Sequence, residues 1–353
     1  MRPRTMTPPL LRNFAISLAF SATAFAQTPG VPWKKPEKWE GQAPFKTTTP
    51  TPAVATQAPR DTKLVEKKLE ELSSVPPSED GRKALAIDPA KWKHAETDNF
   101  ILHYRRVTEA QKVAREMEYD LWYVATTLGA AKERYRKKSH VYVFEDAEEW
   151  KQFLAVSNNP MKWAASYAYG DELFLNVRGG GNTGAGASFD SHTLAHETTH
   201  AVVARIFPGK RWPLWLNEGF AEYMGGASIS ARKGQSARSH RGSLTMADMP
   251  LATLESLEGY PANEAAIGQL YQTSEKFVRF LMSELPKDRI VKFIDTVLGG
   301  KKMQDAVLEV YGDKFKTWDA FMKKYERFTK YCPPRKPKRK RRFTRSSAPT
   351  NRR

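Results

Sequence analysis

Apolar and polar residues alternate in two different ways along this chain, and each way predicts a different kind of element. Dense apolar runs and strict alternation are typical of strands, whereas apolar residues three and four positions apart are typical of amphipathic helices. The first pattern predicts strands at residues 100–104, 141–144, 165–169 and 172–177, with a Gly170-Asp171 hairpin turn between the last two. The second pattern predicts helices at residues 61–73, 108–136, 147–156, 214–223, 251–257, 267–285, 289–298, 303–311 and 315–331.

The order of these elements predicts an α+β fold, with strands in the N-terminal part and only helices in the C-terminal part. Between the two parts, a further helix begins after a cap at Asp190 or Ser191 and stops at Pro208-Gly209. After residue 224, two glycines and a basic, serine-rich stretch predict a loop to about residue 242. A glycine-rich run at residues 178–186 lacks the Lys-Ser/Thr of a phosphate-binding loop, and we expect it to border a cleft.

The helix that follows Asp190 carries the candidate chemistry of the chain. His196, Glu197 and His200 form an H-E-x-x-H motif, in which the two histidines lie four residues apart and therefore on one face of a helix. Glu218, on the next predicted helix, can return a carboxylate to the same place. Two imidazoles and one carboxylate leave a fourth position open for water, as a catalytic zinc ion requires. The alternative is a buried helix whose histidines and glutamates make ordinary hydrogen bonds.

Several neighbouring residues are candidates for supporting roles. Glu222, one turn beyond Glu218, can accept a proton from a metal-bound imidazole, or it is a solvated surface glutamate. Asn217 is placed with it among the residues that orient the ligands. His192, one turn before His196, is either a further member of the site or a polar residue of the first helical turn.

A hydrolase of this kind also needs a donor for the oxyanion that forms on the substrate, and tyrosine or histidine commonly serves. Tyr271 is the first candidate, with Tyr223 and His240 behind it. The alternative for Tyr271 is a core position, because tyrosines at helical spacing are most often buried for packing.

The N-terminal residues predict export. Residues 1–26 combine a basic start, an apolar run and an Ala-Phe-Ala cleavage site, which together are typical of a secretory signal peptide, with an uncleaved anchor as the alternative. Residues 27–60 are rich in proline, threonine and alanine and read as a linker. We therefore expect a helical leader at 61–90 and a folded domain at 91–332, divided into 91–207 and 208–332. The expected location is the periplasm or the extracellular space.

Charge and cysteine content exclude several other classes of protein. Cys332 is the only cysteine, so neither an internal disulfide nor a thiolate metal cluster can form. The net charge is +18, but residues 333–353 contribute ten positive charges and no acid, which leaves +8 for the rest. A disordered basic tail on an exported protein favours anionic envelope polymer or lipid as a partner over nucleic acid. The alternative is a solvated tail without a specific partner.

The motifs resemble those of a known group of enzymes. The sequence from Trp215 to Tyr223, WLNEGFAEY, after the H-E-T-T-H at 196–200, is similar to the gluzincin metallopeptidases, the thermolysin-like clan. Over residues 90–330, the chain more closely resembles the peptidase MA-like family of exported bacterial proteins. The resemblance implies a zincin-like fold, in which a small mixed sheet packs on the H-E-x-x-H helix and a helical C-terminal lobe follows.

The same resemblance implies roles for individual residues. His196, His200 and Glu218 bind one zinc ion, Glu197 is the catalytic base, and Glu222 is the acidic residue that supports the ligands. The aminopeptidase motif Gly-Ala-Met-Glu-Asn is absent upstream of His196, which favours an endopeptidase. In this clan a strand at the edge of the cleft pairs with the substrate backbone, and we expect Leu173, Leu175 and Val177 to form it.

The sequence thus predicts an exported zinc-dependent peptidase with a peptide or protein substrate. Two alternatives stay open: a zinc amidase that acts on cell-wall material, and an envelope-associated binding protein that keeps the zinc fold without catalysis. The presence of Glu197 favours an enzyme, because a binding protein needs no base. The sequence carries no information on the oligomeric state.

Overall fold

The computed structural model describes residues 58–331 except 60, 160–163, 178–189 and 236–246. Outside the described residues lie the expected signal peptide and nearly all of the linker, the glycine-rich run, the part of the expected basic loop from residue 236 on, with His240, and the basic tail. No helix in the described part of the chain is long and apolar enough to span a membrane.

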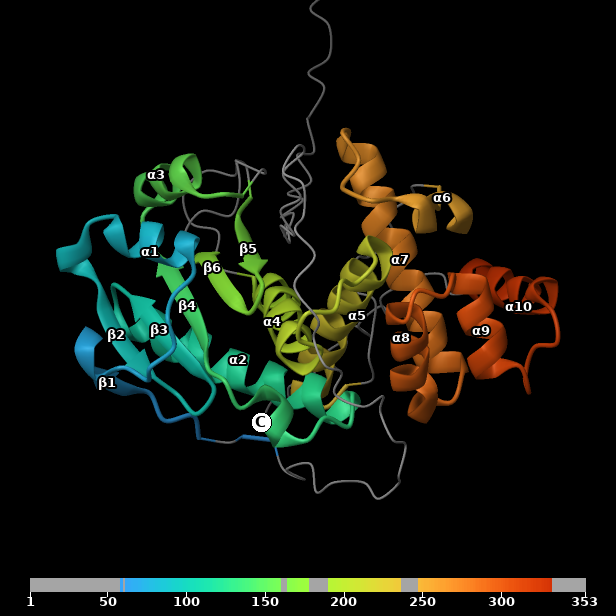
Figure 1. Ribbon diagram of the computed structural model, residues 1–353, viewed down its shortest axis with the longest axis horizontal. Coiled ribbons are helices and arrows are strands. Elements are labelled where there is room, and N and C mark those ends of the chain that lie inside the picture. The colour runs from blue at the N-terminus through green and yellow to red at the C-terminus, as the bar shows by residue number, and fades with distance from the viewer. Residues whose placement is uncertain (1–57, 60, 160–163, 178–189, 236–246, 332–353) are drawn as a thin grey trace, which may run out of the picture.

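In the described residues, six strands form one mixed sheet in the order β1-β2-β3-β4-β6-β5 (Figure 1). The strands are β1 (Val65–Lys67), β2 (Lys93–Glu96), β3 (Phe100–Tyr104), β4 (Ser139–Phe144), β5 (Ser166–Tyr169) and β6 (Glu172–Asn176). The pairs β1–β2, β2–β3 and β6–β5 are antiparallel, whereas β3–β4 and β4–β6 are parallel. Strand β6 is therefore paired on both sides, and β5 is the last strand of the sheet.

Helices cover both faces of this sheet because its side chains are apolar on both sides. Along β4, Val141 and Val143 enter the main core, whereas Tyr142 and Phe144 enter a separate aromatic cluster on the opposite face. The main core is shared with α2 (Val107–Thr127) and α4 (Ser191–Ile206), and the aromatic side is covered by α1 (Glu79–Ala86) and α3 (Ala147–Val156). Helix α4 is thus held between the sheet and the helices that follow it.

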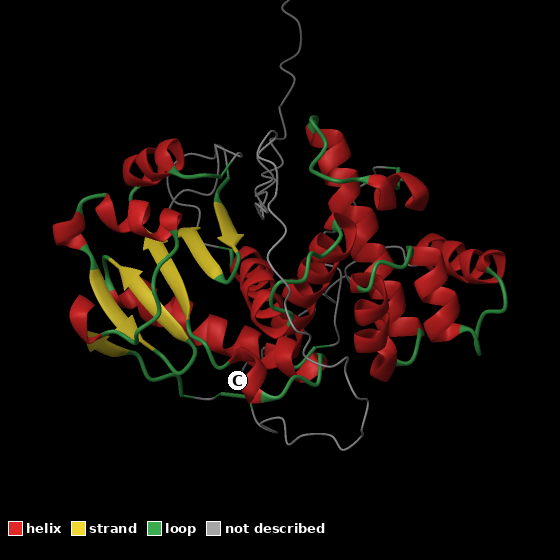
Figure 2. Ribbon diagram, viewed as in Figure 1, coloured by secondary structure: helices red, strands yellow, loops and turns green. Residues whose placement is uncertain are grey.

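The C-terminal part is entirely helical, as Figure 2 shows by the confinement of the strands to one side of the molecule. It contains α5 (Leu214–Arg232), α6 (Leu251–Ser256), α7 (Glu264–Glu284), α8 (Ile290–Leu298), α9 (Met303–Tyr311) and α10 (Trp318–Tyr331). Helix α5 packs on α4 and on α7. At Gly219, a Cβ atom would lie 2.5 Å from the carbonyl oxygen of Ser274, so only glycine allows this approach of α5 to α7. The predicted α+β fold with a helical lobe is confirmed.

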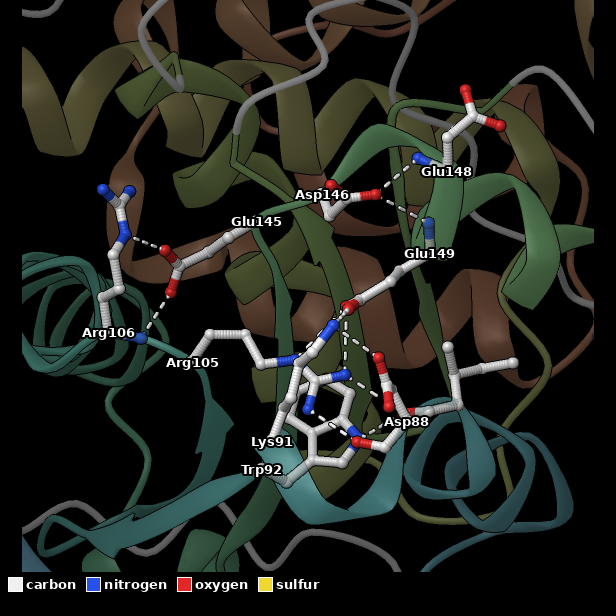
Figure 3. A network of polar contacts seen from close by, with 10 residues as sticks. Asp88, Lys91, Trp92, Arg105, Arg106, Glu145, Asp146, Glu148 and Glu149 are labelled. Atoms are coloured by element: carbon white, nitrogen blue, oxygen red, sulfur yellow. Dashed lines mark hydrogen bonds and ion pairs between the residues drawn. The ribbon is translucent and has the colours of Figure 1, made fainter.

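A polar network fastens the end of β3 to the helices on the aromatic side (Figure 3). The guanidinium of Arg105 lies 3.8 Å from the ring centre of Trp92 and donates to Glu149 Oε2 at 3.0 Å. Next to it, Arg106 donates from its backbone and its side chain to Glu145. Since these residues join β3, β4 and α3, the network fixes the sheet against α3, on the face opposite α4.

The leader segment is part of this sheet domain. The predicted helix at 61–73 is wrong, because these residues form β1 and a single 3-10 turn, Leu69–Glu71. Pairing of β1 with β2 supplies backbone hydrogen bonds that a short isolated helix would have to make alone. The segment is also fastened by Glu172, which accepts from the backbone N–H and the hydroxyl of Ser78 at 2.6 and 2.7 Å.

A row of histidines crosses the sheet below the leader. His94 and His103 approach through their Nδ1 atoms at 2.8 Å, and His103 Nε2 lies 2.9 Å from His140 Nδ1. His140 Nε2 donates to the carbonyl of Val75 at 2.8 Å, because a carbonyl can only accept. If all three rings are neutral, this fixes the proton of His103 on Nε2 and that of His94 on Nδ1. These histidines bond to one another and to the leader, and lie on strands apart from α4.

Two predicted helix ends also differ from the structure. Helix α2 ends at Thr127 instead of near residue 136, because Gly129 adopts a positive φ of 58° and the N–H of Ala130 bonds back to Ala125. Helix α5 continues to Arg232, through the glycines at 225 and 226 that were expected to begin a loop. Burial of these glycines between helices compensates for their low helix propensity.

Candidate active site

Helix α4 brings the two motif histidines together in the core. Asp190 caps the helix by accepting from the backbone N–H of His192 at 3.2 Å, so the expected cap is confirmed. His196 and His200 are 0% and 2% exposed, and their Nε2 atoms are 2.9 Å apart. The helical spacing therefore does place both imidazoles at one point.

Helix α5 returns Glu218 to the same point. Its Oε2 atom lies 3.4 Å from His196 Nε2 and 3.8 Å from His200 Nε2. Ligand atoms of the three residues all lie within 4.8 Å of one another, and all three side chains are buried. The arrangement depends on packing of α5 against α4, and on the close contact with α7 at Gly219.

The Nδ1 atom of each imidazole faces an oxygen atom, which is a hydrogen-bond partner for His200 and an ion-pair contact for His196. His196 Nδ1 lies 3.3 Å from Glu222 Oε1, and His200 Nδ1 lies 3.1 Å from Asn217 Oδ1. An imidazole that donates from Nδ1 carries a lone pair on Nε2 when it is neutral. Both Nε2 atoms then face each other as acceptors, so the site is arranged for a cation or a shared proton.

The residues present fit a divalent metal ion. Within the described residues, Glu218 Oε2 is buried and has no hydrogen-bond donor, although it lies beside the two Nε2 atoms. Two imidazole nitrogens and one carboxylate oxygen form a set of ligand atoms that suits zinc. Their assignment as metal ligands stays a prediction, and the structure supplies the geometry for it.

Without a metal ion, the two histidines have very different pKa values, because the nearby carboxylates outweigh burial at His196 but not at His200. Burial lowers the pKa of His196, but Glu218 and Glu222 outweigh it and raise the value to about 10. Burial lowers the pKa of His200 to about 4, with Glu218 opposing the shift and His196 adding to it. Burial alone would raise the pKa of Glu218, and the two histidines and Tyr260 lower it. The buried negative charge is thus compensated by positive charge on His196, while His200 stays neutral.

Glu222 also contacts the first histidine of α4. Its Oε2 atom lies 3.7 Å from His192 Nε2, while its Oε1 atom faces His196. The side chain is 4% exposed, so the alternative of a solvated surface glutamate is wrong. His192 is 6% exposed and lies behind Glu222, next to the candidate ligands.

Two tyrosines lie beside the candidate ligands, and the sequence predicted only one of them. Tyr271, on α7, is 1% exposed, and its ring centre lies 6.1 Å from that of His196. Tyr260, in the segment before α7, donates from its hydroxyl to Glu218 Oε1 at 2.7 Å. Tyr260 belongs to no periodic pattern, so the sequence held no signal for it. The ring of Tyr223 lies against Arg279 instead.

The expected substrate-pairing strand is placed differently by the structure. Leu173 and Leu175 lie on β6, which pairs with β4 on one side and β5 on the other, and Val177 follows and bonds through its N–H to Phe144. All three side chains are buried. The prediction that these residues form a free edge is wrong, because no backbone edge of β6 is left for a peptide. The end of the sheet next to α4 is β5.

Fold and site together define an α+β protein with a buried His-His-Glu cluster between a sheet and a helical lobe. A family model of the peptidase MA superfamily matches residues 124–325, and the chain belongs to this superfamily. Membership indicates a peptidase, a hydrolase with peptide or protein substrates, and peptidases of this superfamily usually depend on a metal ion. No curated protein and no solved structure matches the chain.

Proposed function

We propose that this protein is an exported zinc-dependent endopeptidase. One observation carries the proposal: the Nε2 atoms of two imidazoles converge with the buried Oε2 of Glu218, which has no hydrogen-bond partner among the described residues, in a chain of the peptidase MA superfamily. His196, His200 and Glu218 would hold the ion. Export is proposed from the signal-like residues 1–26.

When bound there, zinc lowers the pKa of a coordinated water and polarises the peptide carbonyl. The chain supplies the rest of the chemistry. The side chain of Glu197 projects from α4 about 100° around the helix axis from that of His196. It is therefore unsuited to bind the same ion, but it lies on the adjacent face of the helix. It is fully buried, and we assign it the role of general base that takes the proton from the attacking water. The same carboxyl then delivers that proton to the leaving nitrogen.

Metal analysis combined with peptide digestion tests this proposal. Protein purified with zinc supplied should contain one zinc ion per chain, and it should release new amino termini from a mixed peptide library. Cleavage inside long peptides supports an endopeptidase, whereas release of cell-wall stem peptides alone would favour the amidase. Stoichiometric zinc without cleavage of any substrate would instead favour the binding protein.

Strand β5 is the proposed docking edge for the substrate backbone. The N–H of Asn176 bonds to the carbonyl of Ala165, so alternation along the antiparallel pair turns the backbone groups of Ser166 and Ala168 away from β6. In the described residues no strand pairs with this side of β5, and β5 contacts α4, the helix that carries His196 and His200. Because Ser166 and Ala168 are 0% and 1% exposed, the proposal requires this edge to open when a peptide binds. An extended peptide added here would lie along the candidate metal site.

Ala168→Pro is expected to weaken peptide cleavage by about 5-fold or more. Proline removes one outward N–H, worth about 1 kcal/mol or more in a bound complex, and it is tolerated on an edge strand. We expect the effect as a higher KM for an extended peptide, with zinc content unchanged. Ala168→Val keeps the N–H and is the matched control. Equal loss in both variants would point to side-chain packing and contradict the strand assignment.

A further inference from the structure

The two carboxylate oxygens of Glu218 have different surroundings. Oε2 faces the two Nε2 atoms of the histidines. Oε1 accepts a hydrogen bond from the hydroxyl of Tyr260 at 2.7 Å and a second from Asn217 Nδ2 at 3.3 Å. The carboxylate thus has one side supplied with donors and one side without.

This asymmetry restricts how Glu218 can bind a metal ion. To present both oxygens to the ion, the carboxylate would have to rotate and give up its bond to Tyr260. A short hydrogen bond to a charged acceptor is stronger than one between neutral groups, and it can hold a side chain in one orientation. We propose that Tyr260 is a positioning residue, which keeps Glu218 as a one-oxygen ligand aimed between the histidines. The inference rests on the proposed zinc site.

The placement of Tyr260 agrees with this role. Its ring packs against the main core from the segment that joins α6 to α7, and it lies 6.4 Å from the ring of Tyr271. A tyrosine hydroxyl is protonated at neutral pH, so it reaches the carboxylate as a donor. Asn217 acts on the same residues from α5: it accepts from His200 with one end and donates to Glu218 with the other. The hydroxyl of Tyr260 therefore completes a set of bonds that orients the ligands.

A different role for the same hydroxyl would be to donate to the oxyanion of the substrate. The two roles make different predictions for the zinc affinity of a variant that lacks the hydroxyl. A positioning residue acts on the metal site before any substrate arrives, and loss of such a hydrogen bond typically weakens metal binding 10- to 100-fold. An oxyanion donor acts only during catalysis, so its loss lowers kcat and leaves zinc affinity unchanged.

The test compares Tyr260→Phe with the wild type in the full chain. Zinc affinity is measured without substrate, by competition with a chromophoric chelator, and the number of oxygen ligands is measured by X-ray absorption at the zinc edge. We expect Tyr260→Phe to bind zinc 10- to 100-fold more weakly, with an additional oxygen at the ion as Glu218 rotates. Tyr325→Phe is the matched control: it removes a buried hydroxyl from α10, whose ring packs on Phe277 and Phe280.

The outcomes separate the inference from the proposed function. Unchanged zinc affinity and ligand number in Tyr260→Phe would overturn the positioning role, and a lower kcat alone would assign the hydroxyl to the oxyanion. Equal weakening in Tyr325→Phe would also overturn it, because the effect would then be general. Failure of the wild type to bind stoichiometric zinc would instead refute the proposed metal site. Melting curves of the zinc-free variants verify that each one is folded.

Discussion

Glu197→Gln is expected to lower peptide cleavage by about 100- to 10,000-fold while zinc binding is retained, since general bases typically contribute that much. Glutamine has nearly the same shape as glutamate but cannot take a proton from water. Because Glu197 is fully buried on α4 and is not one of the three converging residues, the metal site should persist in the variant. The measurements are kcat on a fluorogenic peptide and zinc content per chain.

The control for this variant is Glu148→Gln. Glu148 has a side chain that is 72% exposed in the first turn of α3, on the face of the sheet opposite α4, and its substitution should leave kcat unchanged. Retention of full cleavage by Glu197→Gln would remove this residue from the mechanism. Loss of zinc together with cleavage would make it a structural residue of the metal site.

The part of the site that follows local rules could be predicted from the sequence. A spacing of four residues on a helix brings His196 and His200 to one face, whatever the rest of the fold does. Glu218 required one more step, since a short connection between two helices makes them antiparallel neighbours. The structure shows this contact between α4 and α5.

The order of strands in the sheet required information that local patterns do not contain. The hairpin at 165–177 was predicted, but not which of its strands pairs with β4. Both strands alternate, so both are consistent with an edge. Burial separates them at one position only: every residue of β6 is buried, and in β5 only Tyr169, at its end, is exposed, at 38%. A strand with neighbours on both sides must be apolar along its length, and the Leu-Phe-Leu of β6 agrees with that.

Tyr260 and the leader show two further limits of sequence patterns. Tyr260 reaches Glu218 across 42 positions from a segment without periodicity, so only the packing of α7 on α5 places it. In the leader, apolar residues had helical spacing, yet Val65 and Leu69 are exposed at 39% and 53%. There the pairing of β1 with β2 decided the structure, and tertiary contacts overrode the weaker local preference.

Asp120→Asn is expected to stabilise the protein, relative to the wild type, more at pH 8 than at pH 4. Asp120 is fully buried on α2, and burial raises its pKa from 3.8 to about 7, although Arg232 and Ser228 on α5 oppose the shift. The folded chain therefore holds this proton more tightly than the unfolded chain does. The resulting contribution to stability is complete below about pH 4 and is lost as the pH rises to about 7.

The size of this effect follows from the shift of about 3 pKa units. At 1.36 kcal/mol per unit, the free energy of unfolding of the wild type falls by on the order of 4 kcal/mol from about pH 4 to about pH 7, relative to that of Asp120→Asn. The amide of the variant does not titrate. The free energy of unfolding is measured by urea denaturation from pH 4 to 8 with a chelator present, so that zinc binding does not contribute. Other titrating groups are common to both proteins and cancel in the difference.

Asp98→Asn, at an exposed position between β2 and β3, is the matched control, and its difference from the wild type should vary little over this range. A difference between the wild type and Asp120→Asn that stays flat from pH 4 to 8 would show that Arg232 and Ser228 fully compensate the buried charge. A difference that grows with pH would instead show that α2 and α5 bury a carboxylate at a cost. The contact concerned joins α2 to α5, the helix that carries Glu218 and Glu222 into the candidate active site.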